Sequence, residues 1–415
     1  MSDTLRSLFS GSRSSGGSTG GQYDDTAASS ASREIRPDAS PGADIRVLGT
    51  GGGGSNAVKR MIESKVQGVE FIALNTDMQA LYHNPAPRKI TIGRGTTRGL
   101  GAGANPDIGK KAAEESSAEI QSTLEGTDML FITAGLGGGT GSGSVAVIAE
   151  LARSMGILTV AVVTKPFSFE GLKRKQQAEE AVANLKGKVD TLITIPNDKI
   201  LSLIDKTTPL TEAFQVVDEV LQHAIEGISN LITEHGLINV DFADVKSIMQ
   251  DAGTALMGIG YGTGDSRAAE AARAAIDSPL LDLSISGAKG VLFNITGGND
   301  LSMFEVDEAA RIITEAADPE ANIIFGAVID EKFTGEVKVT VIATGFEDAA
   351  TEPMAALAAS RGLKTALKGA RMGGAPEEAR EDLRKTSFPS MKSTSLNLNE
   401  EELEVPAFMR KPISK

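Results

Sequence analysis

Residues 137–143 contain five glycines, separated only by Thr140 and Ser142. The apolar run at 129–132 predicts a buried strand before this segment, and residues 145–152 predict a helix after it. A glycine-rich turn between a strand and a helix lets backbone N–H groups approach a phosphate, and the helix N-terminus adds a favourable field. The alternative is a flexible linker or a tight structural turn, but linkers do not usually stand between a buried strand and a helix. The segment therefore predicts a phosphate-binding loop.

A second glycine cluster, residues 49–56, repeats this arrangement nearer the start of the chain. It follows the strand-like residues 44–48 and precedes a helix that we expect from about Ala57. Its glycines also satisfy the G-x-G-x-x-G spacing of dinucleotide-binding folds, which is a weak signal on its own. Such folds carry an acidic residue after the second strand, and Asp77 follows the strand expected at 69–74. A nicotinamide-dependent enzyme is therefore a real alternative at this point.

The other phosphate loops argue against that alternative. A single dinucleotide fold does not need a second phosphate loop at 137–143, and a third glycine-rich segment stands at 99–106. Neither of the first two clusters contains G-x-x-x-x-G-K-[ST], so the chain is not a P-loop NTPase.

Composition excludes several other classes. The formal net charge of −14 argues against bulk binding of nucleic acid, and the lack of cysteine excludes thiol catalysis, disulfides and cysteine–metal sites. His83, His223 and His235 are scattered without the spacing of metal ligands. No apolar run approaches the roughly 20 residues that a membrane-spanning helix needs.

Strand-like and helical runs alternate between residues 43 and 208. This alternation predicts an α/β fold with a doubly wound parallel sheet and a site at the carboxyl ends of the strands. A long helix is expected at 211–234, between Pro209 and Gly236. A smaller α/β unit follows. The expected strands are 44–48, 69–74, 128–133, 157–163 and 190–195 in the first part, and 289–295, 322–329 and 336–343 in the second.

Seven segments resemble the tubulin superfamily of GTPases, and in particular its bacterial cell-division branch, the FtsZ family. They occur in the family's order over residues 43–349. The glycine motif at 137–143 is diagnostic of the superfamily, and NVDFAD of the division branch. The segments are GGGGSNAV (51–58), NTD (75–77), GAGANP (101–106), GGGTGSG (137–143), FEGLKR (169–174), PND (196–198) and GLINVDFADV (236–245).

The resemblance implies a self-assembling GTPase that forms head-to-tail filaments of the bacterial cell-division ring. A non-hydrolysing or DNA-partitioning tubulin relative is the alternative within the superfamily, but it should lack both NVDFAD and the C-terminal tail. The implied divisions are a disordered N-terminal extension (1–42), a GTP-binding domain (43–208), a central connecting helix (209–235), a C-terminal GTPase-activating domain (236–349), a disordered linker (350–400) and an adaptor-binding peptide (401–415).

By the same resemblance, the chain binds GTP or GDP together with Mg²⁺. The three glycine-rich segments would hold the phosphates, and Asn56 and Asn197 would lie beside the base. The implied nucleotide-binding residues are Gly52, Gly53, Gly54, Ser55, Asn56, Asp77, Gly101, Ala102, Gly103, Gly138, Gly139, Thr140, Gly141, Glu170, Arg174, Asn197, Phe214 and Asp218.

Two pairs of these residues are each spaced four apart, and residues at this spacing share one face of a helix. The Phe214 ring could stack on a purine. The Asp218 carboxylate could accept hydrogen bonds from guanine, whereas adenine presents an acceptor at N1. The alternative is a core phenylalanine and a solvated carboxylate. Glu170 and Arg174 form either an exposed ion pair or, by the resemblance, contacts to the ribose and phosphate.

Asp241 and Asp244 precede the helix expected at 245–249. Their spacing alone favours helix capping, with Asp241 as the N-cap and Asp244 in the first turn. The resemblance instead implies that Asp241, Asp244 and Asn239 belong to a catalytic loop, whose carboxylates orient the attacking water in the pocket of the next subunit. The two roles are compatible. A site completed by a second copy implies a heterologous contact, which propagates into filaments when it does not close into a ring.

The C-terminal residues 401–415 are acidic, then apolar around Pro406, then basic. They resemble the peptide with which the division protein binds membrane-tethering adaptors such as FtsA. Met409 stands where the family usually has leucine, and an uninvolved terminus is the alternative. The resemblance further implies a cytoplasmic protein at the mid-cell division ring, on the inner face of the membrane, with no nucleic-acid partner and no direct membrane insertion.

Overall fold

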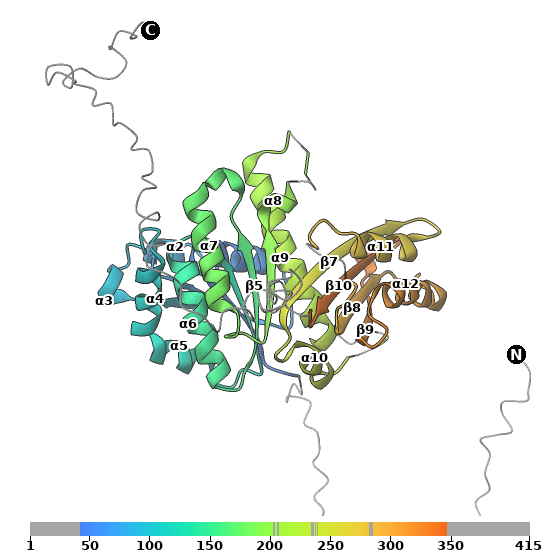
Figure 1. Ribbon diagram of the computed structural model, residues 1–415, viewed down its shortest axis with the longest axis horizontal. Coiled ribbons are helices and arrows are strands. Elements are labelled where there is room, and N and C mark those ends of the chain that lie inside the picture. The colour runs from blue at the N-terminus through green and yellow to red at the C-terminus, as the bar shows by residue number, and fades with distance from the viewer. Residues whose placement is uncertain are drawn as a thin grey trace, which may run out of the picture. The chain divides into compact units, whose positions relative to one another are not determined.

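The computed structural model describes residues 42–346, apart from 202–203, 206, 234–235, 237, 239 and 282–284 (Figure 1). The disordered extension, the linker and the adaptor-binding peptide predicted from the sequence therefore lie outside the described residues, except for Gly42.

The first part of the chain forms a parallel sheet with the strand order β3-β2-β1-β4-β5-β6. The central strands are buried along almost their whole length, as expected for a parallel sheet that is covered on both faces. The strands are β1 (Ile45–Thr50), β2 (Glu70–Asn75), β3 (Arg88–Thr91), β4 (Met129–Gly135), β5 (Leu158–Lys165) and β6 (Thr191–Pro196).

Helices cover both faces of this sheet because successive strand residues point to opposite sides. Val47 packs into the core that α1 and α9 (Leu210–Thr233) cover, whereas its neighbour Leu48 packs into the core under α4, α6 and α7. The other helices of this part are α1 (Gly51–Glu63), α2 (Met78–Tyr82), α3 (Arg94–Thr97), α4 (Pro106–Glu115), α5 (Ser117–Leu124), α6 (Thr140–Ser154), α7 (Leu172–Leu185) and α8 (Asn197–Ile200), with a 3-10 turn, η2, at Ser168–Glu170.

The second part continues the same sheet through β7 (Gly253–Thr263). The start of β7 pairs in parallel with residues 191–193 of β6, and its remainder pairs antiparallel with β10 (Glu336–Thr344). The order then runs β7-β10-β8-β9, so ten strands form one sheet. Strands β8 (Gly290–Gly297) and β9 (Asn322–Ile329) complete it, and α10 (Phe242–Met249), α11 (Arg267–Ile276), α12 (Met303–Ala316) and the 3-10 turn η3 (Glu331–Phe333) are the remaining helical elements.

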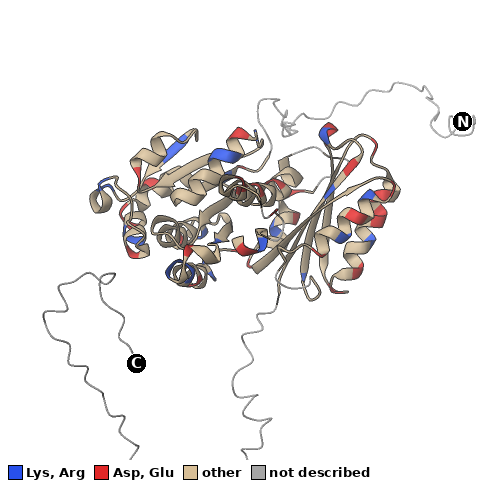
Figure 2. Ribbon diagram, turned by 90° about the horizontal axis from the view of Figure 1, so that it is seen from above, with Lys and Arg blue, Asp and Glu red and all other residues tan. Residues whose placement is uncertain are grey.

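Helix α12 illustrates the acidic character of the folded part of the chain. Acidic side chains outnumber basic ones on α12, at the right of Figure 2, where Arg311 stands among Glu305, Asp307, Glu308 and Glu315. Within the part of the chain that the structure describes, no helix combines the length and the apolar character needed to cross a bilayer.

The expected fold class is confirmed, and all eight strands expected from the sequence are present within two residues of their predicted bounds. The long helix is α9, at Leu210–Thr233. The helix expected from about Ala57 begins at Gly51 instead, so the start predicted for it was wrong. Strands β3 and β7 were missed.

Candidate functional site

The strand order reverses between β1 and β4, and this switch point is where doubly wound sheets bind their ligands. The chain leaves β1 in one direction to β2 and leaves β4 in the other to β5. Helix α1 begins directly after β1, and α6 begins five residues after β4. The N-termini of two helices therefore meet at one crevice, and both favour negative charge there.

Glycines allow these helix N-termini to approach each other. A Cβ on Gly51, whose φ is +70°, would lie 2.7 Å from the backbone nitrogen of Gly141, and a Cβ on Gly53 would lie 3.0 Å from the Cα of Gly135. Real side chains do not tolerate the first of these separations. The two glycine-rich segments are thus one structural unit, in which each excludes side chains from the other.

A cavity of about 390 Å³ opens at this crevice. Small-molecule sites have volumes of this order. Twelve of the eighteen predicted nucleotide-binding residues line it, so the structure brings most of the prediction together in one place. They are Gly52, Gly53, Asn56, Gly138, Gly139, Thr140, Gly141, Glu170, Arg174, Asn197, Phe214 and Asp218.

The remaining six predicted residues lie outside the cavity lining. Gly54 is required by packing, because a Cβ there would lie 2.2 Å from the carbonyl oxygen of Thr133. Ser55 is buried, and its hydroxyl has no partner among the described residues. Asp77 is the N-cap of α2. Gly101, Ala102 and Gly103 belong to the segment before α4, which packs on Gly139.

Polar groups on one side of the cavity have the chemistry to recognise a base. Asn197 is buried, and its Oδ1 has no hydrogen-bond partner among the described residues, which suits an atom that awaits a ligand. Burial raises the pKa of Asp218 to about 6, although the positive charge of Arg60 on α1 acts to lower this pKa. Both residues line the same cavity as Phe214.

Phe214 is not a core residue, because 41% of its surface is exposed. Its ring packs edge-on against Phe167, with 5.5 Å between the ring centroids, and it lines the cavity. The ring is therefore available for stacking. Glu170 and Arg174 contact each other at the cavity, and Glu170 also accepts a hydrogen bond of 2.9 Å from the backbone N–H of Phe167.

Six further residues of the cavity lining were not predicted, because they belong to no motif. Thr164 is the last residue but one of β5, and Pro166 follows that strand. Gly135 ends β4 and Leu136 follows it, whereas Val217 and Leu221 lie on α9. The position of the strand ends was the one available signal.

A larger cavity of about 790 Å³ lies between α9 and strands β8, β9 and β10. It is lined by His223, Asn294 and Lys338, among others, and no glycine-rich helix start reaches it. We therefore assign a phosphate-bearing ligand to the smaller cavity.

The carboxylates of the predicted catalytic loop lie at the other end of the sheet. Asp241 is the N-cap of α10, where its Oδ1 accepts a 2.7 Å hydrogen bond from the N–H of Asp244, so the capping interpretation is confirmed. Both residues are exposed and neither lines the cavity. Asn239 lies outside the described residues.

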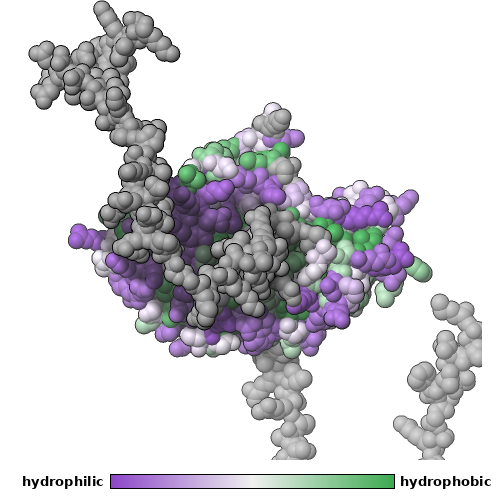
Figure 3. Space-filling view, viewed as in Figure 1, coloured by the Kyte–Doolittle hydropathy of each residue, from purple (hydrophilic) through white to green (hydrophobic). Residues whose placement is uncertain are grey.

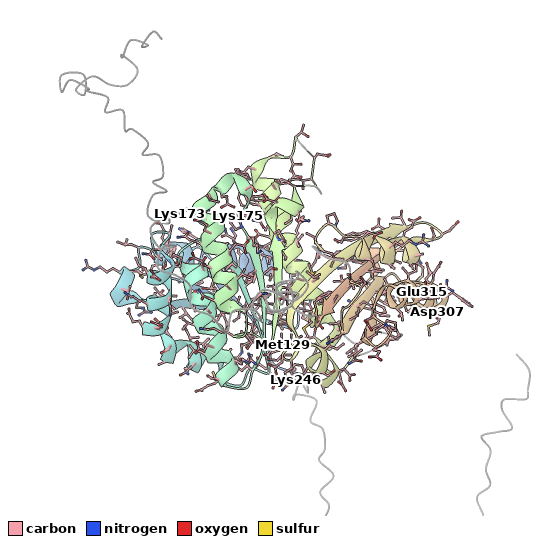
Figure 4. The ribbon with its side chains drawn as sticks, viewed as in Figure 1. Met129, Lys173, Lys175, Lys246, Asp307 and Glu315 are labelled. Atoms are coloured by element: carbon pink, nitrogen blue, oxygen red, sulfur yellow. The ribbon has the colours of Figure 1, made fainter. Side chains whose placement is uncertain are left out.

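The topology explains this separation. Helix α10 precedes the start of β7, which pairs with the start of β6, so α10 lies at the amino ends of the strands and the cavity at their carboxyl ends. Figure 4 shows the same arrangement: Lys246 of α10 lies near Met129, the first residue of β4, whereas Lys173 and Lys175 of α7 lie at the opposite end.

Residues 44–205 match the GTPase domain of the Tubulin/FtsZ family, and residues 253–347 match the C-terminal domain of the FtsZ family. The chain belongs to the FtsZ family. It is 48% identical to a solved FtsZ from M. jannaschii, described as an empty dimer, with a TM-score of 0.71 over 73% of this chain and 88% of that one.

Two more distant solved structures share the fold. CetZ1 from Haloferax volcanii, solved as a GDP-bound monomer, is 20% identical with a TM-score of 0.64, over 74% of this chain and 96% of that one. CetZ2 from the same organism, solved as a GTPγS-bound protofilament, is 20% identical with a TM-score of 0.62, over 74% and 94%. Membership of the FtsZ family, whose GTPase domain the chain matches, implies that the chain binds GTP or GDP.

Proposed function

We propose that this chain is a self-assembling GTPase that forms head-to-tail filaments and hydrolyses GTP at the junction between two subunits. One observation carries the proposal: the nucleotide cavity and the carboxylates of α10 lie at opposite ends of one sheet. We further propose that residues 43–208 form the GTP-binding domain, 209–235 the connecting helix and 236–349 the domain that activates hydrolysis.

Binding of GTP follows from the cavity's lining. The N–H groups at the starts of α1 and α6 receive the phosphates, with Gly52 and Gly138 at the positions where a Cβ would stand in open space. Asn197 and Asp218 accept hydrogen bonds from guanine, and Phe214 stacks on the ring.

Mg²⁺ would be held mainly by the phosphates. Within the described residues, no three His, Asp or Glu side chains stand close enough together to hold a metal ion. This fits a cation that keeps its waters and binds through substrate oxygens. When bound, Mg²⁺ neutralises charge that develops on the phosphates.

Hydrolysis requires the next subunit. Asp241 and Asp244 of that subunit orient a water in line with the bond between the γ-phosphorus and the β–γ bridging oxygen. The water oxygen forms a new bond to phosphorus, the bridging oxygen leaves with GDP, and the water's proton is transferred to a carboxylate. The N-cap geometry supports this role, because it holds Asp241 rigidly against the helix start.

An apolar rim supports burial of the cavity mouth by a second subunit. Phe169, Leu172, Leu201 and Leu210 are between 45% and 71% exposed, and they flank the segments that line the cavity. Figure 3 shows hydrophobic surface near the start of α7 and around α8. Exposed apolar groups of this kind mark interaction sites. Because the two surfaces differ, the contact is heterologous and extends into a filament. The M. jannaschii relative, described as a dimer, agrees with self-association.

Membership of the FtsZ family supports a role in cell division. We propose that the filaments form the division ring in the cytoplasm, at mid-cell on the inner face of the membrane. Residues 401–415, which lie outside the described residues, would bind membrane-tethering adaptors such as FtsA. Nucleic acid is not a partner in this proposal, and the chain does not insert into the membrane.

GTP turnover per molecule should rise above a threshold protein concentration, because an isolated subunit lacks the water-orienting carboxylates. Phosphate release measured over a dilution series, with light scattering in parallel, tests this expectation. A turnover per molecule that does not change on dilution, with unchanged scattering, would contradict the two-subunit site.

GTP binding should weaken as the pH falls through about 6. The guanine donors require an ionised Asp218, whose pKa in the free protein is raised to about 6, so binding lowers that pKa and releases a proton. Below pH 6 the cost of this ionisation reduces the affinity.

Asp218→Ala is the control for this pH dependence, because phosphate groups also titrate near pH 6. The variant should lose the part of the dependence that Asp218 causes, bind GTP more weakly and discriminate less against ATP. The affinities for GTP and for ATP, measured from pH 5 to 8 in the parent and the variant, test these expectations. If the variant binds GTP as the parent does at every pH, Asp218 is only a helix carboxylate.

A further inference from the structure

Helix α10 is short, and its two ends face different surroundings. It spans eight residues, Phe242–Met249, with Asp241 and Asp244 exposed at its start and Val245, Ile248 and Met249 buried. A helix of this length is not stable by itself. The contacts that it makes with the rest of the fold therefore determine where its first turn lies.

Two threonine hydroxyls hold the last turn of α10. The final carbonyl groups of a helix have no partner within the helix. Thr191 Oγ1 donates a 2.5 Å hydrogen bond to the carbonyl oxygen of Met249. The single proton of Thr344 Oγ1 is shared between the carbonyl oxygens of Ile248 at 3.4 Å and Gly290 at 3.3 Å, which makes its hold on α10 the weaker of the two. Both threonines are buried, with 0% and 1% of their surface exposed.

These two contacts come from different halves of the sheet. Thr191 is the first residue of β6, and Thr344 is the last residue of β10. The turn after α10 is fixed at the same place: Asp190 accepts a hydrogen bond from the N–H of Gly253 at 2.9 Å and a longer one, 3.4 Å, from that of Asp251. The helix is therefore anchored where β6 and β7 join.

The same strand links this anchor to the nucleotide cavity. β6 begins at Thr191 and ends at Pro196, and the next residue, Asn197, lines the cavity. One strand thus positions a base contact at one end and α10 at the other.

We propose that Thr191, supported by Thr344, is a positioning residue for GTP hydrolysis in the neighbouring subunit. Its hydroxyl fixes the last turn of α10 and thereby the place at which Asp241 and Asp244 meet the neighbour's γ-phosphate. This inference rests on the proposed function of those two carboxylates.

A small tilt at the anchored end of α10 displaces the carboxylates at its other end. Asp241 and Met249 are eight residues apart, so about 12 Å of helix separates them at about 1.5 Å per residue. A tilt of about 5° at the anchored end would move the carboxylates by about 1 Å, and a misplacement of that size can cost about 10²-fold in rate.

Thr191→Val removes the hydroxyl and retains the shape of the side chain. We expect GTP affinity and assembly close to those of the parent, with turnover per assembled subunit lower by about tenfold or more. Thr191→Ser keeps the hydroxyl and should restore turnover to within about twofold of the parent. A matched control is Thr159→Val on the adjacent strand, because that buried hydroxyl donates to the carbonyl of Ile157 and not to α10.

A mixing experiment separates positioning from damage to the variant's own pocket. Gly138→Trp, which should fill the cavity, is added to Thr191→Val. Wherever α10 of a Gly138→Trp subunit meets the sound pocket of a Thr191→Val subunit, the site has a correctly placed α10, so activity should recover in part. No recovery in a co-assembling mixture, a loss of GTP affinity in Thr191→Val, or slow turnover in Thr159→Val would overturn the inference.

Two further measurements keep the test decisive. If Thr191→Val does not fold, Thr344→Val replaces it, with an expected loss of about threefold because its hydrogen bond is longer; parent turnover in that variant would also overturn the inference. Asp244→Asn is measured beside them. Parent turnover in both Asp244→Asn and Asp241→Asn refutes the proposed role of the loop, whereas slow turnover in Asp244→Asn with parent turnover in Thr191→Val refutes the positioning role alone.

Discussion

Asp244→Asn is expected to lower GTP turnover by about 10²-fold or more, with nearly normal GTP binding and filament assembly. The carboxylate of Asp244 is exposed and makes no hydrogen bond or ion pair with any residue that the structure describes. Asp244 contributes to the fold through its backbone N–H, which donates a hydrogen bond to Asp241. An asparagine at position 244 keeps this N–H. The substitution therefore removes a charge that would orient water and little else.

Asp241→Asn provides the comparison that separates capping from catalysis. Asparagine caps helices about as well as aspartate, so its side-chain oxygen can still accept from the N–H of Asp244. If Asp241 only caps, both folding and turnover stay at the parent level. If it also orients water, turnover falls although thermal unfolding is unchanged.

Phosphate release and light scattering, recorded together after addition of GTP, give the result for both variants. The filaments of a slow variant should persist after the parent has exhausted its GTP. Two asparagine variants that hydrolyse GTP at the parent rate would refute a catalytic role for the loop.

Most strands could be predicted because runs of mainly apolar residues indicate that a strand is buried. β4 and β5 consist mainly of apolar residues, and each is buried over all but its last residue. Long buried strands of this kind can be recognised from the sequence alone, because a strand with one face in water would alternate apolar and polar residues.

β7 could not be predicted, because the packing of a neighbouring helix requires glycines in this strand. It contains glycine at 258, 260 and 262, and strands normally avoid glycine. A Cβ at these positions would lie 1.9–2.0 Å from carbonyl oxygens of α11, at Ala275, Ala271 and Arg267. The glycines make a flat face on which α11 packs directly, a requirement that appears only in three dimensions.

The start of α1 was misplaced for a related reason. Glycine is a poor helix former, so a run of four glycines indicates a loop. In the fold, Gly51–Gly54 form the first turn of α1, and side chains at Gly51, Gly53 and Gly54 would collide with α6 or β4. The close approach of two helix starts outweighs the low helix propensity.

The residues of the candidate site and its place at the carboxyl ends of the strands could be predicted, whereas the surroundings of individual side chains could not. The motifs identified ten residues that the fold gathers around one cavity, and the helical spacing of Phe214 and Asp218 added two more. The raised pKa of Asp218 and the unpaired Oδ1 of Asn197 depend on burial by other elements, so no local pattern could indicate them.

Gly138→Trp is expected to weaken GTP binding by about 10²-fold or more, because a cavity of drug-like size cannot hold both an indole and a nucleotide. A side chain on Gly138 would enter the cavity without disturbing the fold, since its Cβ would have no neighbour within 4 Å. Ala118→Trp, on the exposed side of α5, is the control for adding a bulky aromatic group. Equilibrium binding of GDP and thermal unfolding measure both effects, and normal binding by a folded Gly138→Trp would place the nucleotide elsewhere.

The same variant makes the shared site directly testable. Asp244→Asn has a sound cavity and defective carboxylates, whereas Gly138→Trp has sound carboxylates and a filled cavity. Neither should hydrolyse GTP appreciably alone. In a mixed filament, each junction at which α10 of Gly138→Trp meets the cavity of Asp244→Asn forms one complete site, so up to about a quarter of the junctions in an equal random mixture should be active. Turnover measured against mixing ratio should therefore peak near equal amounts. Co-assembly without any such peak would show that each subunit hydrolyses GTP with its own residues.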